Sequence, residues 1–191
     1  MALTDKLSAI GAAIREKTGG TELLTLDEMP QEIASITTGD VDSIIGGTIT
    51  EVSTNLTTIR GYAFASCKQL TTARFPFATQ IPAHCFNGDS NLTTVEMPNI
   101  TKIDYVAFYG CTNLELTELP SGLTQIMETS FNNCKALKTL TFKSTPTYIG
   151  GDVFSGCTNL LTINVPWAEG EVAKAPWGAT NATINYNYVG D

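Results

Sequence analysis

Several features that mark membrane proteins, secreted proteins and nucleic-acid-binding proteins are missing from this sequence. No apolar run approaches the roughly 20 residues that a membrane-spanning helix needs. Basic residues are scarce, with 11 Lys and Arg against 19 Asp and Glu, and the net charge of −8 disfavours nucleic acid and anionic membranes as partners. The start of the chain lacks a signal-peptide pattern. We therefore expect cytoplasmic synthesis, with assembly into a virion or, if a signal was removed, a cell-surface location.

Patterns that hold metals and cofactors are missing too. The five cysteines include no C-x-x-C pair, which excludes thioredoxin-like and zinc-ribbon arrangements. No D-x-D-x-D-G calcium loop or glycine-rich phosphate loop occurs. Acidic residues are numerous, but they form no recurring pair. The sequence therefore predicts neither a metal site nor a cofactor.

What the sequence does contain is a repeat of 22 or 23 residues. Its pattern is I-x4-F-x2-C-x2-L-x2-h-x-h-P, where h is an apolar residue, and five copies occupy residues 59–166. A unit this short cannot enclose a core alone, so successive copies must stack and bury equivalent side chains against one another. The phenylalanines that define the main column are Phe64, Phe86, Phe108, Phe131 and Phe154.

Each copy predicts two short strands. In the second copy Val95 and Met97 alternate with Thr94 and Glu96, as expected of a strand with one buried face. A second strand is predicted just before each Phe, as at 101–103. Between Phe and Leu, residues rich in Gly, Asn and Ser indicate a tight turn or one turn of 3₁₀ helix.

Cysteine recurs in one column of the repeat. The column holds Cys67, Cys111, Cys134 and Cys157, with Asp89 in the second copy. A linear array cannot give the tetrahedral geometry of zinc, although the spacing would not itself forbid a disulfide. The interpretation that we favour is a ladder of buried, reduced thiols that pack as small apolar groups.

The only histidine, His84, precedes Cys85, which raises the possibility of a thiol enzyme. Neighbouring residues in an extended segment point to opposite faces, so they rarely form a thiol–imidazole pair. The other copies hold Ala63, Ala107, Ser130 and Val153 where Cys85 stands, which indicates a compact buried side chain. We therefore expect no catalytic residue and no enzyme.

The two ends differ from the repeat. Residues 3–14 and about 26–36 show helical spacing and capping signals, and the glycine-rich joint that follows leads to a degenerate first turn around Ile49 and Val52. At the other end, Ile184 and Tyr186 predict a closing strand. Trp167 and Trp177 could cover the end of the core or form a sugar-stacking platform, and we favour the cover.

These elements predict an α+β repeat solenoid of about six turns with short parallel strands. We divide it into an N-terminal helical docking segment (1–38), a joint with the degenerate turn (39–58), five repeats (59–166) and a C-terminal cap (167–191).

The repeats resemble BspA-type leucine-rich repeats, whose turns carry an Ile…Ala-Phe…Gly-Cys…Leu…Pro signature. The segments "AFYGCTNL" (107–114) and "VFSGCTNL" (153–160) are close matches, and the resemblance covers about residues 48–166. Asp89 departs from it, as do Glu115 and Leu116, where small residues are usual. The resemblance implies a curved solenoid used for adhesion or protein recognition, with no catalytic residues.

Residues 3–36 resemble the N-terminal segment of tail-associated proteins from phages and prophages of Gram-positive bacteria, through the blocks "IREKTGG" and "LDEMPQEI". That resemblance implies docking to a larger particle or self-association through residues 1–38. The expected function is thus a structural or recognition module of a phage or prophage tail or baseplate. The alternative is a bacterial surface adhesin or host-interaction protein.

The predicted binding surface is the row of outward strand positions. We expect it either to be a solvated sheet face or to bind a protein or glycan. Its residues are Thr72, Arg74, Thr94, Glu96, Glu118, Thr139, Thr141, Thr162 and Asn164.

Overall fold

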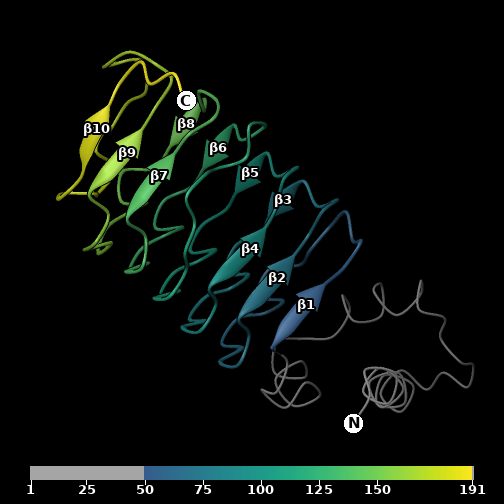
Figure 1. Ribbon diagram of the computed structural model, residues 1–191. Helices are drawn as coiled ribbons and strands as arrows, with labels where there is room; N and C mark the ends of the chain where they lie inside the picture. The colour runs from purple at the N-terminus through teal and green to yellow at the C-terminus, as the bar shows by residue number, and fades with distance from the viewer. Residues whose placement is uncertain (1–49, 191) are drawn as a thin grey trace, which may run out of the picture.

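Short parallel strands from successive turns of the chain form two rows along the molecule (Figure 1). The computed structural model describes residues 50–190. Three-residue strands make the first row: β1 (Glu51–Ser53), β2 (Thr72–Arg74), β4 (Thr94–Glu96), β7 (Thr139–Thr141), β9 (Thr162–Asn164) and β10 (Thr183–Asn185). Two-residue strands make the second: β3 (Gln80–Ile81), β5 (Lys102–Ile103), β6 (Gln125–Ile126) and β8 (Tyr148–Ile149).

Equivalent residues of neighbouring turns lie side by side in both rows. In the second row Ile81 pairs with Ile103, Ile103 with Ile126, and Ile126 with Ile149, all in parallel register. These four strands form one sheet. The second predicted strand is therefore confirmed before Phe86, Phe108, Phe131 and Phe154, whereas no such strand precedes Phe64. The segment between Phe and Leu is a turn in every copy, with no 3₁₀ helix between residues 50 and 190.

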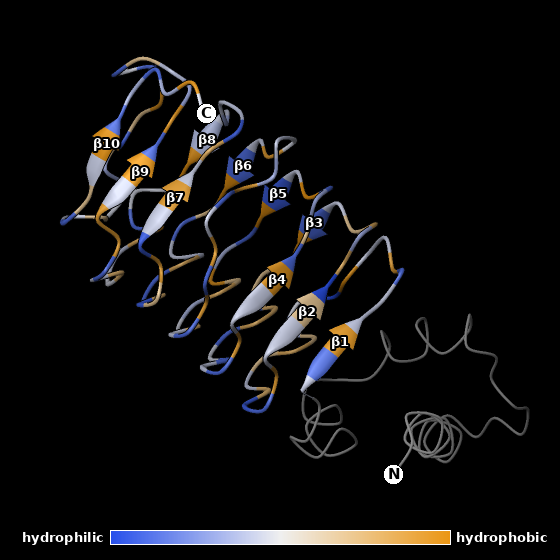
Figure 2. Ribbon diagram, in the orientation of Figure 1, coloured by the Kyte–Doolittle hydropathy of each residue, from blue (hydrophilic) through white to orange (hydrophobic). Residues whose placement is uncertain are grey.

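A stack of phenylalanine rings runs through the core. Phe108 lies between Phe86 and Phe131, with ring centroids 5.2 and 5.0 Å away, and all three are fully buried. Phe154 continues the stack at one end, and Phe64 at the other is only partly buried. The predicted column of equivalent side chains is thus confirmed. In Figure 2 the long strands show the matching alternation of hydropathy, because their central residue is apolar and lies between polar residues.

A left-handed backbone residue starts the turn that leads to each of several phenylalanines. Tyr62, His84, Val106 and Thr129 have φ between 58° and 64°. This conformation is costly for a β-branched residue such as Val106. At two of these positions a hydrogen bond between turns offsets part of the cost: the N–H of Tyr62 donates to the Ala83 carbonyl at 3.2 Å, and that of His84 to the Tyr105 carbonyl at 3.0 Å. The side chains at these equivalent positions differ because what the positions share is the left-handed backbone conformation.

The C-terminal end of the core is closed by the two tryptophans and a last strand. Strand β10 pairs in parallel with β9, with Ile184 opposite Ile163, as expected of a closing strand. Trp167 and Trp177 are 3% and 0% exposed and meet edge to face. Burial of both rings contradicts the sugar-stacking platform and matches a cover over the last turn.

The predicted helical pair of residues 3–36 and the docking segment 1–38 lie outside the described residues, as does Ile49. Residues 50–190 contain no α-helix, so the described part is a β-solenoid and the α+β class is not supported by it. Strand β1, which contains Val52, lies where the degenerate first turn was expected. No helix among residues 50–190 is long and apolar enough to cross a membrane.

Candidate functional site

The outward positions of the long strands lie in register on one face of the solenoid. Thr72 is opposite Thr94, and Arg74 is opposite Glu96, in the sheet of β1, β2 and β4. In the sheet of β7, β9 and β10, Thr139 is opposite Thr162, and Thr141 is opposite Asn164. The structure thus places eight of the nine predicted residues along this face, in two sheets, and the ninth, Glu118, joins the row through a bridge to Thr141.

Several of these side chains are already held by their neighbours. Arg74 forms ion pairs with Glu96 at 2.9 Å and with Glu51 at 3.5 Å. Asn164 donates a hydrogen bond to the hydroxyl of Thr141 and is only 7% exposed. It is therefore buried, whereas the sequence predicted an outward surface residue. Glu118 pairs with Lys143. Carboxylates outnumber cations in this row, because Glu51, Glu96 and Glu118 face only Arg74 and Lys143.

The row is not continuous, because the third turn has no long strand. The sheet of β4 ends there, and a separate sheet begins at β7 (Figure 1). Beneath this interruption the turns remain tightly stacked: β3 pairs with β5 and β5 with β6, and the phenylalanine column is unbroken. The gap is therefore confined to one side of the solenoid.

Two residues of the third turn explain the gap. The inward central position of the long strand holds an apolar residue in the other turns, for example Val95 and Leu140, but Thr117 in the third. The outward position before it holds threonine in neighbouring strands but Leu116 here. In the structure Thr117 is exposed and Leu116 is half-buried against the core. A strand places alternate residues on opposite faces, so this exchange of polar and apolar residues is incompatible with a strand in the common register.

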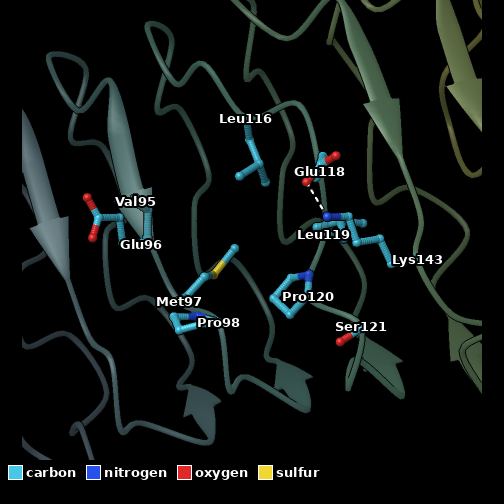
Figure 3. A pocket seen from close by; sticks show the side chains of 10 residues that line it. All are labelled: Val95, Glu96, Met97, Pro98, Leu116, Glu118, Leu119, Pro120, Ser121 and Lys143. Carbon is cyan, nitrogen blue, oxygen red and sulfur yellow. Dashed lines mark ion pairs between the residues drawn. The ribbon is translucent and has the colours of Figure 1, made fainter. Parts of the chain in front are cut away.

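The gap is a groove with a volume of about 440 Å³. Met97 and Leu116 extend toward each other across it, whereas Glu96 points away (Figure 3). Leu119 is buried beneath the groove, and Glu118 with Lys143 lies on its rim. The residues that line it are Val95, Glu96, Met97, Pro98, Leu116, Glu118, Leu119, Pro120, Ser121 and Lys143.

Backbone hydrogen-bonding groups face the groove from both sides. Thr94 and Glu96 direct theirs toward β2, as shown by the bonds from Thr94 N–H to the Thr71 carbonyl and from Phe75 N–H to the Glu96 carbonyl. Successive residues of a strand direct their backbone N–H and C=O groups to alternate sides, so those of Val95 point to the third turn. Among residues 50–190, no backbone hydrogen bond joins Val95 to that turn.

The opposite side of the groove has the same property. The carbonyl of Thr117 accepts from the N–H of Thr141, and the N–H of Leu119 donates to the Thr141 carbonyl, so both are used toward β7. The N–H and C=O of Glu118 therefore point back toward β4. They too have no backbone partner within the described part of the chain. The groove thus combines an apolar floor with two strand edges whose inward backbone groups have no backbone partner in the described part of the chain.

The structure gives the histidine–cysteine pair a setting that disfavours a reactive thiol. The segment was expected to be extended, but it forms a turn in which His84 takes the left-handed conformation. Cys85 is fully buried, and burial raises the pKa of its thiol well above the ordinary value. The ring of His84 stacks on Tyr62 at 4.3 Å.

The other cysteines are buried and unbonded to one another, as the thiol ladder predicts. Burial raises the pKa of Cys111, of Cys134 and, to about 11, of Cys157. Residues 50–190 contain no cluster of three or more His, Cys, Asp or Glu residues that could hold a metal ion.

One polar cluster ties the C-terminal cap to the repeats. Tyr148 donates a hydrogen bond to Glu128 and accepts one from Lys174 at 3.1 Å. The hydrogen bond from Tyr148, with the nearby charge of Lys174, lowers the pKa of the Glu128 carboxyl. These residues come from two repeats and the cap, so the cluster joins the cap to the repeats.

The sequence shows a departure from the repeat at Glu115 and Leu116, but this departure alone did not predict a groove. Met97, Pro98, Leu119, Pro120, Ser121 and Lys143 were also not predicted as surface residues of a site. The detectable signal was Thr117 in a column that is otherwise apolar.

Comparisons with known proteins agree with this architecture. Residues 79–172 match a family model described as "BspA type Leucine rich repeat region", in six copies. A crystal structure of a leucine-rich repeat protein from Bacteroides ovatus has a TM-score of 0.60 and 24% identity over 71% of this chain. The T. pallidum leucine-rich repeat protein has a TM-score of 0.53 and 25% identity over 73% of the chain.

A third solved structure is that of a leucine-rich cell surface protein from Faecalibacterium prausnitzii, with a TM-score of 0.57 and 27% identity over 62% of this chain. The matches cover 35%, 64% and 32% of the three longer proteins, in the order given. No curated protein matches the chain significantly. The comparisons support the leucine-rich-repeat solenoid, a scaffold that typically binds proteins or surfaces.

Proposed function

We propose, on the premise that residues 79–172 form BspA-type leucine-rich repeats, that this chain is a non-enzymatic recognition module. It binds a protein partner through the outward face of its long strands. The observation that carries the proposal is the in-register row of outward strand residues, interrupted by an apolar groove.

A protein partner fits this face better than a glycan. Sugar rings are commonly bound by stacking on aromatic side chains, and the outward positions of the six long strands hold only Thr, Ser, Glu, Arg and Asn. The tryptophan pair that could have supplied a platform is buried. Paired charges and an apolar groove are instead typical of protein interfaces.

The test uses the full chain on a display library of protein fragments and, in parallel, on a glycan array. We expect protein fragments to be retained, and the double variant Thr139→Arg, Thr162→Arg to lose most of that binding. The matched control is Phe77→Ala, which changes an exposed residue away from the long strands. Retention only by glycans, or equal retention by the double variant, would disprove the proposal.

Two settings suit such a module. The resemblance of residues 3–36 favours a phage or prophage tail or baseplate, with residues 1–38 as the docking segment. The likeness to a protein described as a cell surface protein favours the bacterial surface. Antibody labelling of purified phage particles and of intact cells separates them: label on particles supports the first setting, and label on cells without particles supports the second.

Self-association through residues 1–38 is a further part of this proposal. Light scattering of the full chain and of a form without those residues tests it. An oligomer that becomes a monomer on truncation supports docking through this segment, whereas the same mass per particle in both forms contradicts it.

A further inference from the structure

We propose that the groove at the third turn binds an extended segment of a partner protein by strand addition, with one large apolar side chain of that segment inserted between Met97, Leu116 and Leu119. This inference rests on the recognition function proposed above and names the place and the chemistry of the ligand.

The backbone of the groove supports strand addition. Val95 on one side and Glu118 on the other direct an N–H and a C=O into the groove, and neither has a backbone partner within residues 50–190. Open strand edges are ready templates for pairing with another chain. An extended peptide supplies the alternating donors and acceptors that such an edge lacks.

The floor of the groove specifies an apolar anchor. The inward position of the third turn is held by Thr117, which is exposed. The space that an inward apolar side chain would fill there is therefore left open. Val95 is 8% exposed, whereas the equivalent Ala73, Leu140 and Ile163 are fully buried, so its partner in the column is missing. A volume of about 440 Å³ is enough for a bulky side chain, and filling it would complete the column that the sequence interrupts.

Charge specifies the flanks of the segment. The row that borders the groove carries Glu51, Glu96 and Glu118 against Arg74 and Lys143, an excess of one negative charge. The whole chain has a net charge of −8. A partner segment with Lys or Arg beside its apolar anchor is therefore attracted, whereas an acidic segment is repelled.

A double substitution that removes the groove gives a sharp test. Leu116→Thr with Thr117→Val turns the third copy from "LELTELP" into "LETVELP", which matches the "LTTVEMP" of the second copy in the pattern of inward and outward residues. The new valine can enter the column and the third turn can form its strand. We expect the amides of Val95 and Glu118 to exchange quickly with solvent in the original chain. In the double variant, the amides that bond across the new strand pair should become protected.

The binding experiment selects random short peptides from a display library on the original full chain, with counter-selection on the double variant. We expect enriched peptides to carry an apolar residue flanked by Lys or Arg and to bind the original chain at least about tenfold more tightly than the double variant. Proline scanning should abolish binding where the peptide N–H bonds to the β4 edge. Phe77→Ala changes an exposed residue that is neither in the row nor in the lining of the groove, so it is the control and should leave binding unchanged.

A second variant covers the case in which the double substitution does not fold. Leu116→Arg keeps the turn but places a charge in the groove wall, and it should weaken the same peptides by a similar factor. Enrichment of peptides that bind all variants equally, or no enrichment, would overturn strand addition in the groove. If fragment binding nevertheless depends on Thr139 and Thr162, the recognition function stands and only this inference fails.

Discussion

The thiol of Cys134 donates a hydrogen bond to the carbonyl of Phe108, one turn earlier, over a distance of 3.1 Å. Cys111 and Cys157 make the same bond to Phe86 and Phe131. In the third, fourth and fifth copies, the cysteine therefore links its turn to the previous one by donating a hydrogen bond. Removal of its proton would convert that donor into a buried anion beside a carbonyl oxygen.

This relationship predicts a loss of stability at alkaline pH. The folded-state pKa of these thiols is raised above the unfolded value of about 8.5, so their stabilising contribution is complete below that pH and declines as pH rises above it. Urea unfolding at several pH values should show the free energy of unfolding falling above about pH 9. In Cys111→Ala, Cys134→Ala the decline should be shallower, and an identical slope would contradict the explanation.

The same burial predicts slow chemical labelling. In the folded chain at neutral pH, a thiol-directed reagent should react far more slowly than with a free thiol, and in urea all five cysteines should react. Mass spectrometry of labelled peptides gives the rate at each site. Rapid and selective labelling of Cys85 in the folded state would reopen the possibility of a thiol enzyme.

Truncation of a ring in the phenylalanine column should be costly. Phe108→Ala removes a fully buried ring that contacts rings on both sides, and we expect a loss of about 3–5 kcal/mol in the free energy of unfolding. Phe77→Ala is the control, because Phe77 is 53% exposed and should cost about 0.5 kcal/mol or less. Similar losses for the two variants in urea melts would contradict a stacked core.

Two glycines separate backbone conformation from packing. Gly170 and Gly178 both have positive φ, but an added Cβ meets nothing within 4 Å at Gly170 and lies 2.9 Å from the Ser155 nitrogen at Gly178. Gly170→Ala should cost roughly 1–2 kcal/mol from conformation alone. Gly178→Ala should cost roughly 2–5 kcal/mol, because the cap must also move away from the last repeat. Equal costs would mean that the cap does not pack closely there.

The cluster of Glu128, Tyr148 and Lys174 predicts weakening of the cap at acid pH. The lowered pKa of Glu128 means that its contribution is present above the unfolded value of about 4.3 and is lost as pH falls below it. Tyr148→Phe should cost about 0.5–1 kcal/mol at neutral pH, since about a third of the Glu128 side chain is exposed and solvent screens the charge. The difference between the two proteins in urea melts should shrink below about pH 4. A pH-independent difference would contradict the role of the carboxylate.

The repeat was sufficient to predict the stack, the two rows of strands and the buried columns, because equivalent residues recur at a fixed interval. The chemistry at Asn91 and Asn159 was not predicted, although both occur in the recurring "NL" pair. In the structure their amides donate to the carbonyls of Lys68 and Lys135 in the preceding turns. Such bonds depend on the distance between turns, which the sequence does not contain.

The groove could not be predicted from the pattern alone for a related reason. Leu116 and Thr117 show that the third copy breaks the alternation, but a broken alternation could be absorbed by a bulge, a shift of register or an open gap. Whether a bulge, a shift of register or a gap results depends on how strongly the neighbouring turns are paired. Here the unbroken pairing of Ile81, Ile103 and Ile126 prevents a shift, so the misfit is confined to the surface.

The interruption also divides the face into two blocks of three strands whose lengths are independent of each other. Each turn contacts only its immediate neighbours, so a turn inserted or deleted beyond β2 or beyond β9 would lengthen or shorten one block and leave the walls of the groove in place. Changes in repeat number within such a gene would therefore alter the reach of the molecule while preserving what it recognises at its centre.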